Sequence, residues 1–230
     1  MRPNLYPNIT AILFLLLAGA SLAGCTPHHI GVTEVGVKFN KVTSSFEEYK
    51  EAGATYFFMP FLNDWRTYDT ATRSLVMNRS SNSGDRKEKD DLRFKTRDGN
   101  DIETDVTIRW RIDPMKIAYI WSHVAPSSDE IEQRLVRPLA RTYVRDTLNR
   151  LDSEEFYNPT LRFKAGTEAT RLLGAHLEPY GVKVEQVIQG DFSFKPDYQH
   201  LINSKKESEK QAEKLEAEIL ATQEKNQATL

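Results

Sequence analysis

The alternation of apolar and polar residues between positions 101 and 112 constrains the fold more than any other feature of this sequence. Apolar residues recur at every second position except for Thr104, and the charged residues between them would point to the opposite side. This pattern is typical of a strand that packs one face on a core and leaves the other in solvent. The predicted buried face is formed by Ile102, Val106, Ile108, Trp110 and Ile112.

The strand's partner is the segment before Gly99, and the length of the loop between them fixes the register. A two-residue turn would place Phe94 opposite Glu103, so that an apolar side chain faces a charge. A three-residue loop that ends at Gly99, with this glycine in a left-handed conformation, pairs Phe94 with Ile102 instead. The same register predicts the cross-strand charge pairs Arg93–Glu103 and Lys95–Asp101.

Acidic residues on the solvent face of this strand raise the question of a metal site. Asp101, Glu103 and Asp105 share that face, and calcium sites need several oxygen ligands brought together. Pairing with Arg93 and Lys95 is the expected use of these carboxylates, so no metal site is predicted. The adjacent His28 and His29 have no second cluster of ligands near them in the sequence, and they are interpreted as structural.

Sequence motifs of catalysis are missing from the chain. It contains no glycine-rich phosphate loop, no HExxH zinc motif and no serine in a GxSxG turn. We therefore predict no catalytic residues, no enzymatic activity and no cofactor. The formal net charge of −2 leaves no basic excess, which argues against a nucleic-acid partner.

Helix signals dominate after Pro114. A short helix is expected at 115–122, and Ser127 with Glu130 has the spacing of a capping box that starts the next helix. Pro138 should kink that helix, because proline removes one backbone hydrogen bond. Its predicted apolar stripe is Ile131, Leu135, Leu139, Val144, Leu148 and Leu151. A further helix at 158–179 and a strand at 182–194, with Gly181 capping the turn between them, complete a predicted α+β domain with a mixed sheet packed by helices.

The composition changes from about Lys195 onward. Residues 202–230 contain neither glycine nor proline and are dominated by helix formers. Ala212, Leu215 and Ile219 recur at heptad spacing, although the seam is thin. Such a helix suits packing beside neighbouring copies, with a solvated tail as the alternative.

The N-terminal end has the three-part build of a secretory signal. Arg2 supplies a positive charge, residues 9–17 are apolar and residues 18–24 are mostly small. The apolar stretch is shorter than the roughly 20 residues that a transmembrane helix needs. The segment ends in Leu22, Ala23, Gly24 and Cys25, which resemble a bacterial lipobox. We therefore expect cleavage before Cys25 and covalent lipid on its sulfur, rather than a transmembrane anchor or a buried cysteine.

Five aromatic residues are clustered between positions 56 and 65. Interleaved aromatic residues on a strand usually form core, but neighbouring positions cannot all point to one side of a sheet. Core packing and contact with lipid are therefore both open. The candidate membrane-contact residues are Tyr56, Phe57, Phe58, Phe61 and Trp65.

Three segments in order resemble the SPFH superfamily, also called Band 7, which includes stomatins, prohibitins and flotillins. They are "TRDGNDIETDVTIRWRIDP", "LVRPLARTYVRD" and "EPYGVKVEQVIQGDFSF", the last leading into the charged helix. The resemblance implies a membrane-anchored scaffold whose β-rich domain lies at the bilayer and whose helical arm aligns with identical arms in rings or cages. In several branches this enclosure surrounds a membrane AAA+ protease.

The predicted function is a lipid-anchored, homo-oligomeric scaffold in the bacterial cell envelope that faces the periplasm or the cell exterior. Arg109 and Arg111, with Ala212, Leu215 and Ile219, are the candidate lateral contacts, and solvated surface is the alternative for the arginines. A different function remains open, in which a monomer or small oligomer binds and regulates a membrane protease or transporter. The predicted organisation is a signal peptide (1–24), a lipidated linker (25–30), an SPFH domain (31–194) and a helical arm (195–230).

Overall fold

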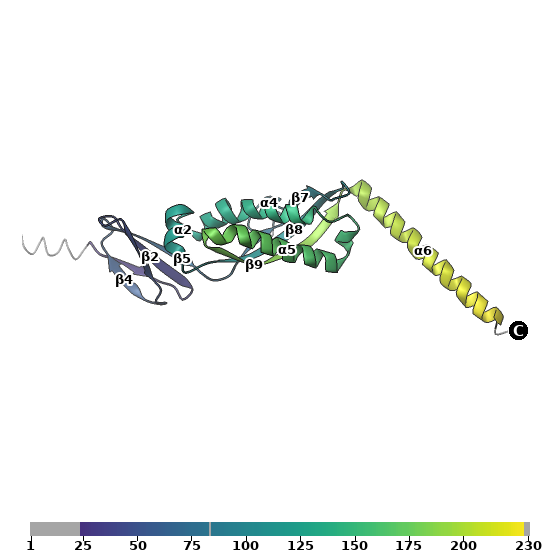
Figure 1. Cartoon of the computed structure of the whole chain (residues 1–230), viewed down its shortest axis with the longest axis horizontal. Helices are drawn as coiled ribbons and strands as arrows, with labels where there is room; N and C mark the ends of the chain where they lie inside the picture. The colour runs from purple at the N-terminus through teal and green to yellow at the C-terminus, as the bar shows by residue number, and fades with distance from the viewer. Residues whose placement is uncertain (1–23, 83, 228–230) are drawn as a thin grey trace, which may run out of the picture. The chain divides into compact units, whose positions relative to one another are not determined.

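The computed structural model describes residues 24–82 and 84–227, which form two compact units (Figure 1). The first unit contains the chain up to Leu75 together with Ile108–Ala140 and Thr170–Gln186. The second contains Val76–Thr107, Arg141–Ala169 and the chain from Val187 onward. Each unit combines strands and helices that are distant in sequence. The fold is α+β, as predicted.

Five strands lie wholly in the first unit, and they form two small antiparallel sheets. One sheet pairs β1 with β4, and the other has the order β3-β2-β5. Strand β2 pairs with both of its neighbours up to its last residue, where Asn40 lies opposite Ser45 of β3 and Asn63 of β5. The strands are β1 (Thr26–His29), β2 (Glu34–Asn40), β3 (Ser45–Tyr49), β4 (Thr55–Phe58) and β5 (Asn63–Asp69).

Strand β1 corrects the expectation of a linker at residues 25–30. Thr26 lies opposite Phe58 and His29 lies opposite Thr55, so the strand begins directly after Cys25. The ring nitrogen Nδ1 of His29 and Oγ1 of Thr55 are 3.2 Å apart. Four residues of the sequence TPHH carry no strand pattern of their own. Their conformation depends on a partner strand almost thirty residues away, which local sequence analysis cannot detect.

A second antiparallel arrangement is built around β8. Its order is β6-β8-β7, and β9 also pairs with β8. The predicted apolar face of β8 is confirmed, because its five members are at most 1% exposed. The strands are β6 (Arg73–Met77), β7 (Leu92–Lys95), β8 (Asp101–Ile112) and β9 (Val182–Phe194).

The predicted hairpin between β7 and β8 is also confirmed. Phe94 lies opposite Ile102, and the charge pairs fall in the expected register. The backbone N–H of Thr96 donates to the carbonyl of Asn100 across a three-residue loop, and Gly99 has φ +88°. A residue with a Cβ would be strained in this left-handed conformation, so the glycine fixes the loop length and thereby the register.

The helical signals placed the helices correctly. The Oγ of Ser127 accepts a hydrogen bond from the N–H of Glu130 at 3.3 Å, as the capping box predicts, and Gly181 has φ +79°. In Figure 1, α6 is one uninterrupted helix at the yellow end of the chain. The α-helices are α2 (Ile117–His123), α3 (Ser128–Ile131), α4 (Arg137–Leu148), α5 (Pro159–Leu177) and α6 (Pro196–Gln227). Shorter turns are the π turn η1 (Glu132–Val136) and the 3-10 turns η2 (Glu155–Tyr157) and η3 (Glu178–Tyr180).

A π turn lies where the sequence predicted a continuous helix with a proline kink. The N–H of Arg137 donates to the carbonyl of Glu132, five residues earlier, and the next residue, Pro138, has no N–H to donate. The extra residue in this turn shifts the apolar stripe by one position. Val136 and Ala140 are fully buried, whereas the predicted Leu135 and Leu139 are only half-buried. The prediction was therefore wrong at those two positions.

Candidate functional site

The predicted anchor lies at the start of the described chain. Cys25 is exposed, forms no disulfide and directly precedes strand β1. Gly24 is the first described residue, while Leu22 and Ala23 of the predicted lipobox lie outside the described residues. The lipid on Cys25 and the cleavage before it stay predictions.

The five predicted membrane-contact residues divide into two groups. Three rings, those of Tyr56, Phe58 and Trp65, pack together within the first unit, with centroid separations of 5.3 to 6.2 Å. Phe57 and Phe61 instead remain 66% and 68% exposed. Alternation along β4 explains this division, because Phe57 points away from the side shared by its two neighbours. Packing within the unit therefore accounts for three of the five residues, whereas lipid contact stays a prediction for Phe57 and Phe61.

The packed rings form a cluster with Tyr49 and His28. The Tyr49 ring lies 4.6 Å from Tyr56, and the His28 ring lies 5.4 Å from Trp65. This cluster, here called the ring cluster (His28, Tyr49, Tyr56, Phe58 and Trp65), joins the β1–β4 sheet to the β3-β2-β5 sheet. Trp65 also lies against the backbone of Gly36, where an added Cβ would come within 2.2 Å of its ring. The glycine therefore makes room for the indole.

A half-buried lysine lies against the ring cluster. The ammonium group of Lys38 is 5.0 Å from the Phe58 centroid and 2.7 Å from Oε2 of Glu47. Burial works to lower the pKa of Lys38, but hydrogen bonds to Glu47 and Tyr49 outweigh it, so that this pKa is raised. Hydrogen bonds from Lys38 and Tyr49 in turn lower the pKa of Glu47. The cluster therefore already holds a cation of its own chain.

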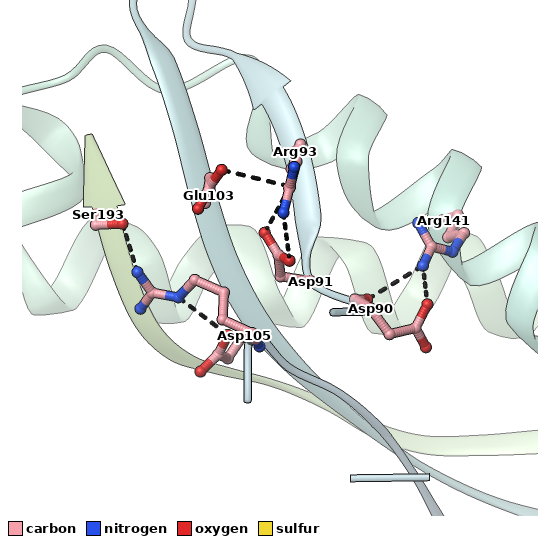
Figure 2. Close-up of polar contacts among 8 residues, drawn as sticks. Asp90, Asp91, Arg93, Glu103, Asp105, Arg141 and Ser193 are labelled. Carbon is pink, nitrogen blue, oxygen red and sulfur yellow. Dashed lines mark hydrogen bonds and ion pairs between the residues drawn. The ribbon is translucent and has the colours of Figure 1, made fainter. Parts of the chain in front are cut away.

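Ion pairs and hydrogen bonds between charged side chains connect segments of the second unit, and Figure 2 draws these contacts. Arg93 lies between Asp91 and Glu103, with Nε–O distances of 3.1 and 3.4 Å. Arg141 contacts the side chain of Asp90 and also donates to its backbone carbonyl at 3.1 Å. Both aspartates are only 4% exposed, which makes these contacts strong constraints on the segment before β7.

A third arginine connects β8 and β9 in the same unit. Nε of Arg79 lies 3.4 Å from Asp105, and its guanidinium group also donates to Oγ of Ser193. Figure 2 labels both partners, Asp105 and Ser193. The backbone N–H of Arg79 donates to the same carboxylate at 3.0 Å. These three arginines with their acidic partners are here called the ion network: Arg79, Arg93, Arg141, Asp90, Asp91, Glu103 and Asp105.

The acidic strand face is used for charge pairing. Asp101 lies 3.0 Å from Lys95 and 2.6 Å from Lys195, and hydrogen bonds from these two lysines lower its pKa. Glu103 and Asp105 face Arg93 and Arg79, as described above. Within residues 24–82 and 84–227, no group of three or more acidic, histidine or cysteine residues has a geometry that could hold a metal ion.

A shallow pocket of about 560 Å³ lies where β7, β8 and β9 end in the second unit. Phe94 and Phe194 supply apolar surface, while Lys95, Asp101 and Lys195 line it with charges that pair with one another. Its hydroxyl, Ser193, is held by Arg79 and has no histidine beside it among the lining residues.

The predicted lateral arginines have an acidic partner within the first unit. Nε of Arg111 lies 3.3 Å from Glu185 on β9, and Arg109 lies 4.0 Å from the same carboxylate. Both guanidinium groups are nearly half-exposed. A role in lateral contact stays a prediction. A neighbouring copy would have to contact Glu185 as well, or contact the exposed part of each guanidinium group.

From its start to residue 221, helix α6 exposes most of its side chains. Ile202 is 6% exposed, but Leu201, Leu215 and Ile219 are 55% to 65% exposed. At the start of the helix, Lys206 lies 3.9 Å above the ring of Tyr157. These contacts hold the first turns of the helix within its unit, and the predicted heptad positions further along are uncovered.

Comparison with known families identifies the chain. The family model described as "SPFH domain / Band 7 family" matches residues 28–228, nearly the whole chain. The chain therefore belongs to the SPFH/Band 7 family, whose members are generally non-catalytic, membrane-associated scaffolds. No curated protein matches the sequence. The match extends into α6, beyond the predicted domain end at residue 194. Across the described residues, no helix is both long and apolar enough to span a membrane.

Proposed function

We propose that this protein is a lipid-anchored scaffold whose copies assemble side by side on a membrane into a ring or cage. In this proposal the signal peptide at 1–24 is removed and Cys25 carries the lipid. The domain at 31–194 lies near the bilayer, and the arm at 195–230 contacts neighbouring copies. The assembly organises a patch of membrane or encloses a membrane protein complex. Membership of a family of membrane-associated scaffolds supports the general function.

One observation carries the assembly part of the proposal. Helix α6 runs for 32 residues, yet Leu215, Ile219 and Leu220 along it are 59%, 55% and 60% exposed. An isolated helix gains little stability from propensity alone, and most helices are stabilised by packing of an apolar stripe. A neighbouring copy of α6 would provide that packing at the heptad positions.

The mechanism of assembly is avidity on a surface. Each thin seam gives only a weak contact, but anchoring in two dimensions raises the effective concentration of copies. A contact between different faces of adjacent copies repeats and closes into a ring when its rotation allows closure. Many weak contacts can therefore hold one large assembly.

The mass of the detergent-extracted protein tests the proposal. Light scattering should find a large assembly, and truncation after Phe194 should reduce it to single chains or small oligomers. A native mass of one to four chains would contradict the scaffold. That result would favour a small lipoprotein that regulates one membrane protease or transporter, such as a AAA+ protease.

A double variant tests the seam without removing the helix. Leu215→Glu with Ile219→Glu places charges on the exposed stripe and should dissolve the assembly while circular dichroism retains the helix. Ala217→Glu is the matched control, because two residues of helix turn this position to the opposite side of the stripe. Equal assembly of both variants would exclude the seam as the contact.

The anchor is tested by mass spectrometry of the protein purified from its own membrane. The expected N-terminal peptide begins at Cys25 and carries more than one acyl chain, because one chain alone gives only marginal binding. Cys25→Ser should release the protein from the membrane fraction. An unmodified cysteine in an uncut chain would refute the anchor.

A further inference from the structure

Side chains in and next to the turn η2 hold the first turns of α6 on the second unit. Nζ of Lys206 lies 3.9 Å from the centre of the Tyr157 ring, and Lys205 forms an ion pair with Glu154. The side-chain amide of Gln199 donates to the hydroxyl oxygen of Tyr157 at 3.2 Å. A buried isoleucine at position 202 lies on the same side of the helix and is only 6% exposed. These residues are here called the arm clasp: Glu154, Tyr157, Gln199, Ile202, Lys205 and Lys206.

Tyr157 is itself fixed by the aromatic core of the second unit. The centre of its ring lies 5.3 Å from that of Phe192 and 5.9 Å from that of Phe194, both on β9. The preceding residue, Phe156, is 1% exposed and its ring lies 5.8 Å from Phe192. The Phe194 ring also lies 5.1 Å from the ring of Tyr198 in the first turn of α6. The helix is therefore attached to a closely packed part of the unit rather than to a surface loop.

Two neighbouring residues show how α6 is rotated about its own axis. Leu201 is 65% exposed, whereas Ile202 is 6% exposed. Successive residues of an α-helix are about 100° apart around its axis, so the side of the helix that carries Leu201 is turned away from the unit. Leu201 lies two heptads before Leu215, which places the two leucines on nearly the same side. The exposed stripe of α6 therefore begins at Leu201 and continues through Leu215 and Ile219, although the sequence analysis did not include Leu201.

The remainder of the arm depends on the clasp for its orientation. Residues 210–221 are all exposed, so within the described part of the chain the contacts that orient the arm lie at its start. After Pro196, α6 contains neither proline nor glycine, and helices without such breaks bend only gently. The orientation of the first turns thus determines the orientation of the whole helix.

The contacts of the clasp differ in strength. The side chains of Lys205 and Glu154 are 52% and 68% exposed, and an ion pair so exposed contributes little. The burial of Ile202 and the contact of the Lys206 ammonium group with the Tyr157 ring contribute more. Ile202 and Lys206 are therefore the residues whose removal should open the clasp.

We propose that the arm clasp holds α6 in one direction and one rotation, with the exposed stripe turned away from its own unit. A neighbouring copy then meets a stripe that is already oriented. Less conformational entropy is lost on contact than with a freely moving arm, so a thin seam can suffice. The benefit for contact between copies rests on the proposed assembly, whereas the fixed orientation of the arm does not.

Pulsed electron paramagnetic resonance tests the fixed orientation. The soluble Cys25→Ser form has no other cysteine, so Lys164→Cys on α5 and Lys214→Cys on α6 give two defined sites for spin labels. Both lysines are exposed, and both belong to the second unit. Dilution with unlabelled protein restricts the measurement to distances within one chain. A single narrow distance distribution is expected in this labelled parent, and a broad distribution overturns the inference.

A double variant opens the clasp. Ile202→Ser with Lys206→Ser removes its two main contacts and should broaden the distance distribution about twofold, because several arm orientations become populated. Leu201→Ser with Lys210→Ser is the matched control, because it makes the same two changes on exposed side chains of the same helix. Its distribution should stay as narrow as that of the parent. Both variants must retain the circular dichroism and thermal transition of the parent, and Lys206→Ser alone should give an intermediate width. Equal widths in the two double variants overturn the clasp.

The mass of the assembly separates this inference from the proposed function. In the lipidated full-length chain, Ile202→Ser with Lys206→Ser should lower the mass of the detergent-extracted assembly, although Leu215 and Ile219 are intact. An undiminished assembly of chains with a mobile arm overturns the benefit for contact between copies. A parent that contains only one to four chains contradicts the proposed assembly, whereas a narrow distance distribution in that same parent still supports the clasp.

Discussion

The first unit joins its two small sheets through aromatic rings, whereas the second unit ties its strands and loops with charged side chains. In the first, Trp65 lies 5.3 Å from Phe58, and both belong to a cluster of five rings. In the second, Arg93 and Arg141 hold two aspartates that are almost fully buried. Ring packing depends on buried area, which salt and pH hardly change, but ion pairs respond to both. Disrupting one set at a time should therefore affect the two units differently.

The largest effect is expected from removing the indole at the centre of the ring cluster. Trp65→Ala should lower the free energy of unfolding by about 3 kcal/mol, because it leaves a cavity between the two sheets of the first unit. Urea denaturation of the soluble Cys25→Ser form measures this change. Phe57→Ala removes an exposed ring on β4 of the same unit and should have almost no effect. If both variants lose the same free energy of unfolding, the ring cluster does not join the two sheets.

Disrupting the ion network should cause the second largest loss in the free energy of unfolding. Arg141→Met removes a guanidinium group from the buried Asp90 and should cost about 1 to 3 kcal/mol. Arg145→Met, on the same helix, removes a group whose ion pair with Asp146 is long and exposed, and it provides the control. High salt should reduce the difference between the two variants. If Arg141→Met leaves the free energy of unfolding unchanged, solvent can replace this contact.

Acid should act on the second unit through Asp98. Burial raises the pKa of Asp98, but hydrogen bonds from Thr96 and Ser153 outweigh it and lower the pKa below the ordinary 3.8. A depressed folded-state pKa contributes stability above pH 3.8, and that contribution is lost as the pH falls through the folded-state value. Asp98→Asn should therefore flatten the loss of stability below about pH 4 in acid titrations. An unchanged loss of stability in this pH range would contradict the role of Asp98.

The smallest effect is expected at the exposed pairs of β8. Arg111→Gln removes a half-exposed contact with Glu185 and should change the free energy of unfolding by no more than about 0.5 kcal/mol. If the same variant lowers the mass of the detergent-extracted assembly, Arg111 contributes to contact between copies rather than to folding. No change in either quantity would identify it as a solvated surface residue.

Local patterns were sufficient to predict the centre of the fold. The burial of β8 follows from alternation, and the register with β7 follows from rejecting a charge opposite Phe94. Both depend on residues within about twenty positions of one another. Strand β9 and the cap at Gly181 were equally visible, because a glycine and a run of β-formers mark them.

Features that depend on distant partners were missed. Strand β1 has no pattern of its own, and Val42 is exposed because Asn40 holds a turn beside residues 59–62, twenty positions along the chain. The division of the aromatic residues required knowing which side of β4 faces another sheet. The sequence indicated only that the five rings could not all share one environment.

The π turn at Glu132–Val136 has a consequence for how this domain can change over evolution. In a π turn the backbone hydrogen bond spans five residues instead of four, so the turn contains one residue more than a turn of α-helix. Loss of a single position there would rewind the helix into regular form with its flanking parts still facing the same way, because the π turn absorbs the extra residue. Rewinding without that loss would instead rotate the flanking parts by about 100° against each other. The turn η1 is therefore a point at which the chain can lose one residue without changing which side chains of α3 and α4 face inward.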